Sequence, residues 1–160
     1  MSVIRCQEPD PTDNEQRTTN NEQRTITMIG ILVVAHGQIA QELVHAAEII
    51  VGPLTRIKPI SIDVSDGVNS ARERIRKAIK EVNDGSGVLV FTDMFGGTPS
   101  NISLSFLDEF KVEVLTGVNL PMLLKLATMS NGSMPLEELA MTLKKTGQDS
   151  IHVASEFLHR

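Results

Sequence analysis

The chain has 160 residues, of which 41% are hydrophobic and 3% aromatic, a single cysteine, Cys6, and a formal net charge of −5 at pH 7. This length suits one domain with an aliphatic core, and the negative net charge gives no basic footprint for nucleic acid, whose binding usually demands clustered Lys and Arg. The lone cysteine excludes an intrachain disulfide, and no apolar run reaches the ~18 residues of a membrane span. We therefore expect a cytoplasmic protein, and from its charge one that binds no nucleic acid.

Residues 1–27 form a polar leader that differs in composition from the rest of the chain. Its residues 8–11 alternate acidic side chains with prolines, and the run Asn-Glu-Gln-Arg-Thr at 14–18 recurs at 21–25. Such a segment has almost nothing to bury, so ordering it would cost conformational entropy without return. We predict that the leader is disordered and that one folded domain spans residues 28–160. The sequence leaves open whether synthesis starts at Met1 or at Met28.

From Met28 onward, apolar strands alternate with amphipathic helices. Unbroken apolar runs indicate strands buried on both faces, whereas apolar residues three and four positions apart indicate helices. The predicted strands cover residues 29–35, 57–62, 88–92 and 111–116, with a weaker one at 150–154. The predicted helices cover residues 38–51, 69–82, 99–107, 121–128 and 136–146. The expected buried face of the first helix consists of Ile39, Leu43, Ala46, Ala47 and Ile50.

This alternation predicts a doubly wound α/β fold with a mostly parallel sheet and helices on both faces. Ligands of such sheets bind beyond the carboxyl ends of the strands, where the winding direction reverses. If the strand order is 2-1-3-4, the first and third strands are neighbours at that point. His36 follows the first strand and Asp93 follows the third, so we expect the two side chains to face each other.

A histidine beside an aspartate suits nucleophilic chemistry. Neutral imidazole is a good nucleophile, and its ordinary pKa of ~6.5 leaves a useful fraction uncharged at cellular pH. A carboxylate bonded to one ring nitrogen fixes the tautomer and leaves the lone pair of the other nitrogen free. Asp93 is the candidate orienting carboxylate and His36 the candidate nucleophile.

The stretch Gly96-Gly97-Thr98-Pro99 supplies a candidate phosphate site. Pro99 suits the first position of a helix, and Thr98 before it is a candidate N-cap. Two glycines let backbone N–H groups approach a ligand closely, and free amides, a hydroxyl and the helix dipole together favour an anion. Each residue alone has an ordinary structural alternative, but their convergence at one point of the sheet favours phosphoryl transfer. No nucleotide-binding glycine motif is present, and we expect neither a metal nor a cofactor.

Three blocks of the chain, residues 28–37, 92–99 and 117–123, resemble the IIA components of the mannose family of the bacterial phosphotransferase system. The resemblance extends from residue 28 to about residue 158. It implies that His36 accepts a phosphoryl group from the carrier protein HPr on Nε2 and passes it to a IIB component for sugar uptake. By the same resemblance Asp93 is the hydrogen-bonded partner of His36. The remaining site predictions are phosphate binding by Gly96, Gly97 and Thr98, and a rim for partner proteins at Phe95 and Asn119.

The resemblance also implies a homodimer in which a final antiparallel strand, at 150–154, is exchanged between two subunits. Because the chain ends at Arg160, without the linker that joins IIA to IIB in some relatives, we expect IIB on a separate chain and only indirect membrane association through transporter subunits. An alternative with the same chemistry is a regulatory phosphoprotein without a transport role. Two further alternatives are the phosphocarrier subunit of dihydroxyacetone kinases, whose sequence after the third strand differs, and a passive flavodoxin-like ligand binder.

Overall fold

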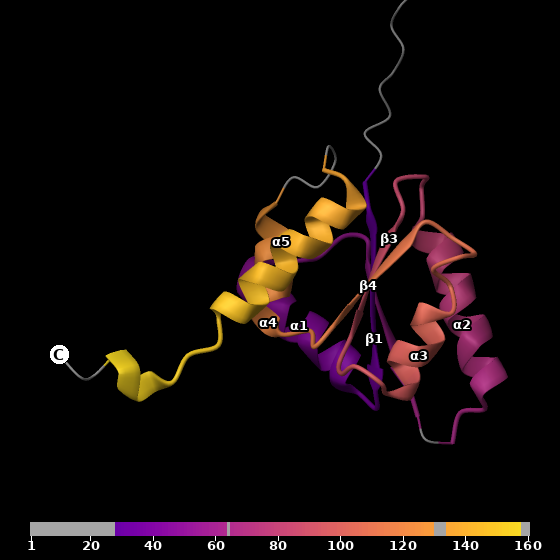
Figure 1. The fold of residues 1–160 in the computed structure, drawn as a ribbon, viewed down its shortest axis with the longest axis horizontal. Helices are drawn as coiled ribbons and strands as arrows, with labels where there is room; N and C mark the ends of the chain where they lie inside the picture. The colour runs from indigo at the N-terminus through magenta and orange to yellow at the C-terminus, as the bar shows by residue number, and fades with distance from the viewer. Residues whose placement is uncertain (1–27, 64, 130–133, 158–160) are drawn as a thin grey trace, which may run out of the picture.

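The computed structural model describes residues 28–63, 65–129 and 134–157, so the predicted leader at 1–27 lies outside the described residues. A parallel four-stranded sheet has the order β2-β1-β3-β4. Its strands are β1 (Gly30–His36), β2 (Ile57–Ile62), β3 (Val88–Thr92) and β4 (Val112–Thr116). One face is covered by α1 (Ile39–Val51), α4 (Leu120–Thr128) and α5 (Leu136–Asp149), the other by α2 (Val68–Val82) and α3 (Thr98–Leu104) (Figure 1). The predicted α/β class, parallel pairing and strand order are confirmed.

The two central strands explain the unbroken apolar runs of the sequence. In β1, Ile31 and Val33 belong to the core beneath α1, α4 and α5, whereas Leu32 and Val34 belong to the core beneath α2 and α3. Successive side chains of a strand point to opposite faces, and both faces of this sheet carry helices. An alternating polar pattern is therefore absent, and the site-bearing strands are held rigidly from both sides.

The buried face of α1 differs from the predicted one. Its fully buried residues are Ala40, Val44 and Ala47, whereas Ile39 and Ile50 are 46% and 59% exposed. The small side chains of Ala40 and Ala47 let α1 lie close to the sheet and to α4. The face of α1 that contacts them is therefore the one with these residues, and the larger isoleucines lie beside it. The prediction that Ile39 and Ile50 are core residues is therefore wrong. One consequence is an apolar surface at the start of α1, three residues after His36.

The helix predicted at 99–107 is shorter and begins one residue earlier. It starts at Thr98 with Gly97 as the N-cap, so the prediction that Thr98 caps this helix is wrong. Pro99 lies within its first turn, where a missing N–H costs nothing. Near its end the Ser103 and Ser105 hydroxyls donate to backbone carbonyls one turn back, a bond that competes with regular helix geometry. The chain continues as turns to β4.

The strand expected at 150–154 is not formed in the described single chain. Helix α5 continues to Asp149, Ser150 is its C-cap, and a 3₁₀ turn, η3 (Ala154–Phe157), follows an irregular stretch. Figure 1 shows this C-terminal segment extending away from the body of the domain. A strand needs a neighbouring strand for its backbone N–H and C=O groups, and among the described residues the segment pairs with no strand of the sheet. The sequence pattern alone could not supply that neighbour.

Candidate functional site

The switch point of the sheet brings His36 and Asp93 together, as predicted. His36 is the last residue of β1, and Asp93 follows the last residue of the adjacent strand β3. Asp93 Oδ2 lies 2.7 Å from Nδ1 of His36 and also accepts the backbone N–H of His36 at 3.0 Å. Its other oxygen, Oδ1, accepts the N–H of Met94 at 2.9 Å. The carboxylate therefore has both oxygens engaged and cannot rotate without losing a hydrogen bond.

This arrangement determines the protonation of the pair. Burial raises the pKa of Asp93, but the backbone N–H and the ring of His36, together with the N–H of Met94, outweigh burial and hold that pKa below its usual value. An ionised carboxylate only accepts hydrogen bonds, so Nδ1 of His36 carries the proton in the neutral ring. The lone pair of Nε2 is then free. The side chain of His36 is 38% exposed, so a ligand can reach that nitrogen.

Gly96 and Gly97 form a loop, which we call the glycine loop, and Gly97 lies directly against the imidazole of His36. A Cβ built on Gly97 would lie 2.9 Å from Cε1 of His36 and 3.5 Å from its Nε2. Contacts under 3.0 Å are not tolerated by real Cβ atoms, so the ring in its present position requires glycine there. Gly96 has a φ of +80°, a conformation that L side chains rarely adopt. Both glycines are thus required by geometry, one by close approach and one by its backbone angle.

The other predicted site residues have separate positions. Thr98 is exposed, and it lines a groove between α2 and α3 with Val68 and Arg72. Phe95 is 75% exposed on the loop that carries Asp93. Asn119 has an internal role, because its side chain caps α4 by accepting the N–H of Met122 and also donates to the carbonyl of Gly147 in α5. Its assignment to a partner rim stays a prediction.

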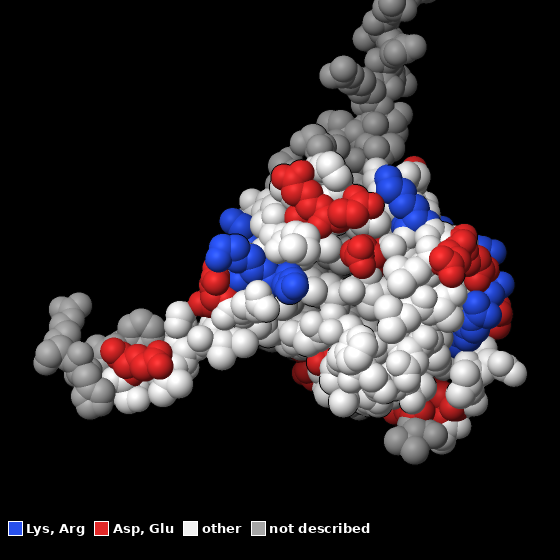
Figure 2. Space-filling model, viewed as in Figure 1, with Lys and Arg blue, Asp and Glu red and all other residues white. Residues whose placement is uncertain are grey.

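Two apolar residues beside His36 were not anticipated. Met94 is 54% exposed and follows Asp93 on the same loop as Phe95, whereas Ile39, the first residue of α1, is 46% exposed three residues after His36. We call these three residues the apolar rim. In the view of Figure 2 a broad uncharged area occupies the middle of the lower half of the molecule, and acidic side chains lie along its lower edge. The signal in the sequence was the Met-Phe pair in a loop between a polar site residue and two glycines.

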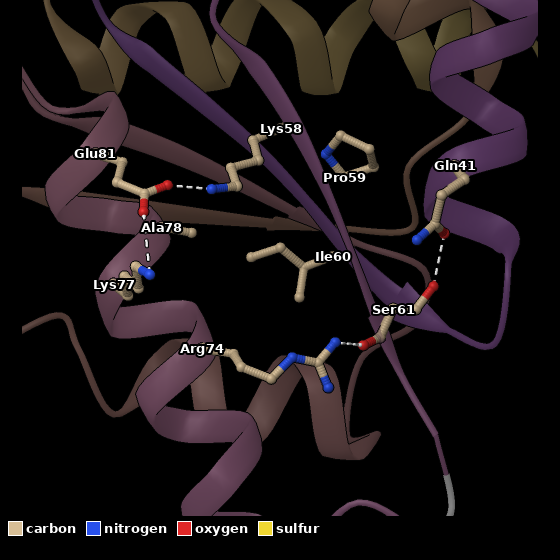
Figure 3. A pocket seen from close by; sticks show the side chains of 9 residues that line it. All are labelled: Gln41, Lys58, Pro59, Ile60, Ser61, Arg74, Lys77, Ala78 and Glu81. Carbon is tan, nitrogen blue, oxygen red and sulfur yellow. Dashed lines mark hydrogen bonds and ion pairs between the residues drawn. The ribbon is translucent and has the colours of Figure 1, made fainter.

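A hollow on the outer edge of β2 is a weaker candidate site. It has a volume of about 290 Å³ and lies between α1 and α2, with Lys58, Arg74 and Lys77 among its lining residues (Figure 3). Lys58 and Lys77 share the carboxylate of Glu81, and Arg74 binds Asp66 and the carbonyl of Ser61. Its cations are therefore already paired within the chain. It contains neither His36 nor the glycine loop.

The described part of the chain lacks two other kinds of feature. Residues 28–63, 65–129 and 134–157 contain no cluster of three or more His, Cys, Asp or Glu side chains that could hold a metal ion. No helix among these residues is long and apolar enough to cross a bilayer.

Comparison with known proteins accounts for this arrangement. The model of the EIIA-man family, described as "PTS system fructose IIA component", matches residues 30–144, which include β1, β3 and the loops that carry the site. The chain belongs to this family. As a mannose-family IIA component it has a general role in a sugar phosphotransferase system.

Individual relatives cover most of the chain. The IIA component is 29% identical to the fructose-specific EIIA component of Bacillus subtilis, over 83% of this chain and 91% of that protein. It is 32% identical to the sorbose-specific EIIA component of Lacticaseibacillus casei, over 74% of this chain and 86% of that protein. Among solved structures, a PTS IIA protein associated with the fucose utilization operon of Streptococcus pneumoniae superposes with a TM-score of 0.72 at 29% identity, covering 83% of this chain and 98% of that one.

Proposed function

We propose that this IIA component is a histidine phosphocarrier that takes a phosphoryl group from phospho-HPr on Nε2 of His36 and passes it to a IIB component in the cytoplasm. One observation carries the proposal: Asp93 Oδ2 lies 2.7 Å from Nδ1, so the ring is protonated on that nitrogen and Nε2 is left as the nucleophile. The glycine loop lies on the Nε2 side of the same ring. Family membership supports the phosphotransferase class of this chemistry.

The transfer step follows from these positions. The lone pair of Nε2 attacks phosphorus, a bond between Nε2 and phosphorus forms, and the bond from phosphorus to the donor breaks. The ring becomes positively charged, and the Asp93 carboxylate stabilises that charge through the Nδ1–H hydrogen bond. Backbone N–H groups at Gly96 and Gly97 receive the phosphoryl oxygens, which carry the negative charge. The same contacts serve the onward step, in which a nucleophile of the IIB component attacks phosphorus and the bond between phosphorus and Nε2 breaks.

The apolar rim of Ile39, Met94 and Phe95 is the proposed docking surface for both partners. Three exposed apolar side chains, two on the loop that follows Asp93 and one at the start of α1, would exclude water from a joint interface without supplying a competing nucleophile. Exclusion of water matters because a phosphohistidine between two proteins must not be hydrolysed.

The test is phosphorylation of the purified chain by phosphoenolpyruvate, Enzyme I and HPr. We expect one acid-labile, base-stable phosphoryl group per chain, and no label in His36→Ala. His45→Ala is the matched control, because His45 is an exposed histidine on α1. Label retained by His36→Ala would refute the site. Onward loss of label to a IIB component distinguishes a transport carrier from a phosphoprotein that only signals.

We also propose that the IIA component is a homodimer that exchanges residues 150–154. Ile151 and Val153 are 76% and 60% exposed and alternate as in a strand that lacks its sheet. Strand β4 is one edge of the described sheet, and the opposite edge, β2, is blocked by Pro59 and by the bond of Arg74 to the Ser61 carbonyl. Pairing with β4 of a second copy would give the segment a strand to pair with.

Sedimentation of a chain truncated after Ser150 tests the dimer. We expect the full chain to sediment as a dimer and the truncated one as a monomer, because the exchanged segment is then missing. A second variant, Ile151→Asp with Val153→Asp, keeps the length and should have the same effect. A dimer that survives both changes would refute the exchange.

A further inference from the structure

The glycine loop contains a peptide group with unusual freedom. The peptide between Gly96 and Gly97 has glycine on both sides, so no Cβ restricts its rotation. Gly96 has a φ of +80° and Gly97 has an extended conformation with φ −76° and ψ 167°. This peptide precedes the first residue of α3 and is not part of the helix. Some other contact must select its orientation.

Asn101 supplies that contact. Its side-chain amide, Nδ2, donates to the carbonyl of Gly96 at 3.2 Å. Its backbone N–H donates to the carbonyl of Gly97 at 2.9 Å, the first hydrogen bond of α3. One residue therefore holds two successive carbonyls of the loop. The second bond is a property of any helix, but the first depends on the asparagine side chain.

The Gly96 bond determines where the Gly97 N–H points. In a trans peptide the carbonyl and the following N–H point in opposite directions, and the described chain contains no cis peptide. With the Gly96 carbonyl turned toward α3, the Gly97 N–H is turned away from it. Among the described residues no backbone or side-chain acceptor takes up that N–H. Gly97 itself lies against Cε1 and Nε2 of His36.

We propose that Asn101 is a positioning residue for phosphoryl transfer, whose side-chain amide holds the Gly96–Gly97 peptide with its N–H free for a phosphoryl oxygen on His36. This inference rests on the proposed function of His36. If the hydrogen bond from Asn101 Nδ2 to the Gly96 carbonyl is lost, the peptide can turn that carbonyl toward His36. The carbonyl oxygen would then repel the phosphoryl group. Asn101 touches neither the ring nor the phosphoryl group, and it acts only through the loop.

The experiment compares Asn101→Ala with the wild type in single-turnover transfer from phospho-HPr. Loss of a preorganised donor from an oxyanion site costs ~10²–10³ in rate, and here the donor is misoriented for part of the time, so we expect a fall of about tenfold. The concentration of phospho-HPr at half-maximal rate should not change, because the apolar rim is intact. Asn101→Gln, which keeps an amide donor on a longer arm, should recover part of the rate.

Ser105→Ala is the matched control, since it removes two side-chain hydrogen bonds one turn further along the same segment. It should transfer at the wild-type rate. A thermal melt of each variant separates misfolding from misorientation, and the ¹H–¹⁵N signal of Gly97 should shift on phosphorylation in the wild type and much less in Asn101→Ala.

The outcomes distinguish this inference from the function on which it rests. A wild type that takes no label refutes the phosphocarrier function. If the wild type takes the label and Asn101→Ala transfers equally fast, the positioning role of Asn101 is refuted while the phosphocarrier function stands. The same holds if the Gly97 signal shifts on phosphorylation as much in Asn101→Ala as in the wild type. A raised half-saturating concentration with an unchanged maximal rate would also overturn it, because Asn101 would then serve docking.

Discussion

Replacement of Asp93 by asparagine tests the central feature of the site, the aimed imidazole. In the wild type the carboxylate accepts three hydrogen bonds, from the backbone N–H and Nδ1 of His36 on one oxygen and from the N–H of Met94 on the other. An amide has only one acceptor oxygen. If that oxygen replaces Oδ2, the NH₂ group faces the Met94 N–H. If it replaces Oδ1, the NH₂ group faces His36, and Nδ1 becomes an acceptor with its proton moved to Nε2.

The second arrangement disables the nucleophile, because Nε2 then carries a hydrogen in place of its lone pair. Both arrangements lose a charge-assisted hydrogen bond, worth about 1.5–3 kcal/mol. At about 1.4 kcal/mol per tenfold change, we expect the transfer rate to fall by roughly 10- to 150-fold. The side chain keeps its shape, so the fold should be retained.

The assay is single-turnover transfer of labelled phosphate from phospho-HPr, with a thermal melt of each protein. Asp108→Asn is the control, because Asp108 is an exposed carboxylate in the segment between α3 and β4, at the opposite end of the sheet from His36. An Asp93→Asn variant that folds and transfers as fast as the control would refute the reasoning, since the carboxylate would then neither orient nor stabilise the ring.

Three further predictions concern the loop and the sheet. Gly97→Ala should slow transfer by about tenfold or more in a transfer assay, because the new Cβ displaces the His36 ring. Its free energy of unfolding, measured by urea titration, should change little, because a φ of −76° suits alanine. Gly30→Ala should instead destabilise the fold by about 1–3 kcal/mol, since its Cβ would lie 2.5 Å from the Val82 carbonyl oxygen; a urea titration that matches the wild type would contradict this. The Met28 N–H and the Arg56 guanidinium lower the pKa of Asp84 from 3.8 to about 2. The folded state therefore gains stability from Asp84 above pH 3.8 and loses it as the pH falls toward 2, so acid titration of Asp84→Asn should show about 1 kcal/mol less stability at neutral pH and a smaller loss on acidification.

The alternation of apolar strands and amphipathic helices was sufficient to predict the fold class, and with the strand order 2-1-3-4 it also predicted the meeting of His36 with Asp93. These features depend on patterns that are local in the chain. A strand buried on both faces has to be apolar throughout, as β1 is, and parallel strands in a doubly wound sheet end at the same edge. The glycine pair was also visible locally, because close approach to a ligand and a positive φ both call for glycine.

Other features depended on neighbours that no local pattern contains. Ile39 fits the apolar periodicity of α1, but the close approach of α1 to the sheet through Ala40 and Ala47 leaves it exposed beside the site. Asn101 has no distinguishing pattern in the sequence, and only the folded loop places its amide on the Gly96 carbonyl. Periodicity thus determined which segments form strands and helices. Only tertiary packing decided which apolar side chains stay in water and which polar one holds the loop, because both depend on how closely separate segments approach one another.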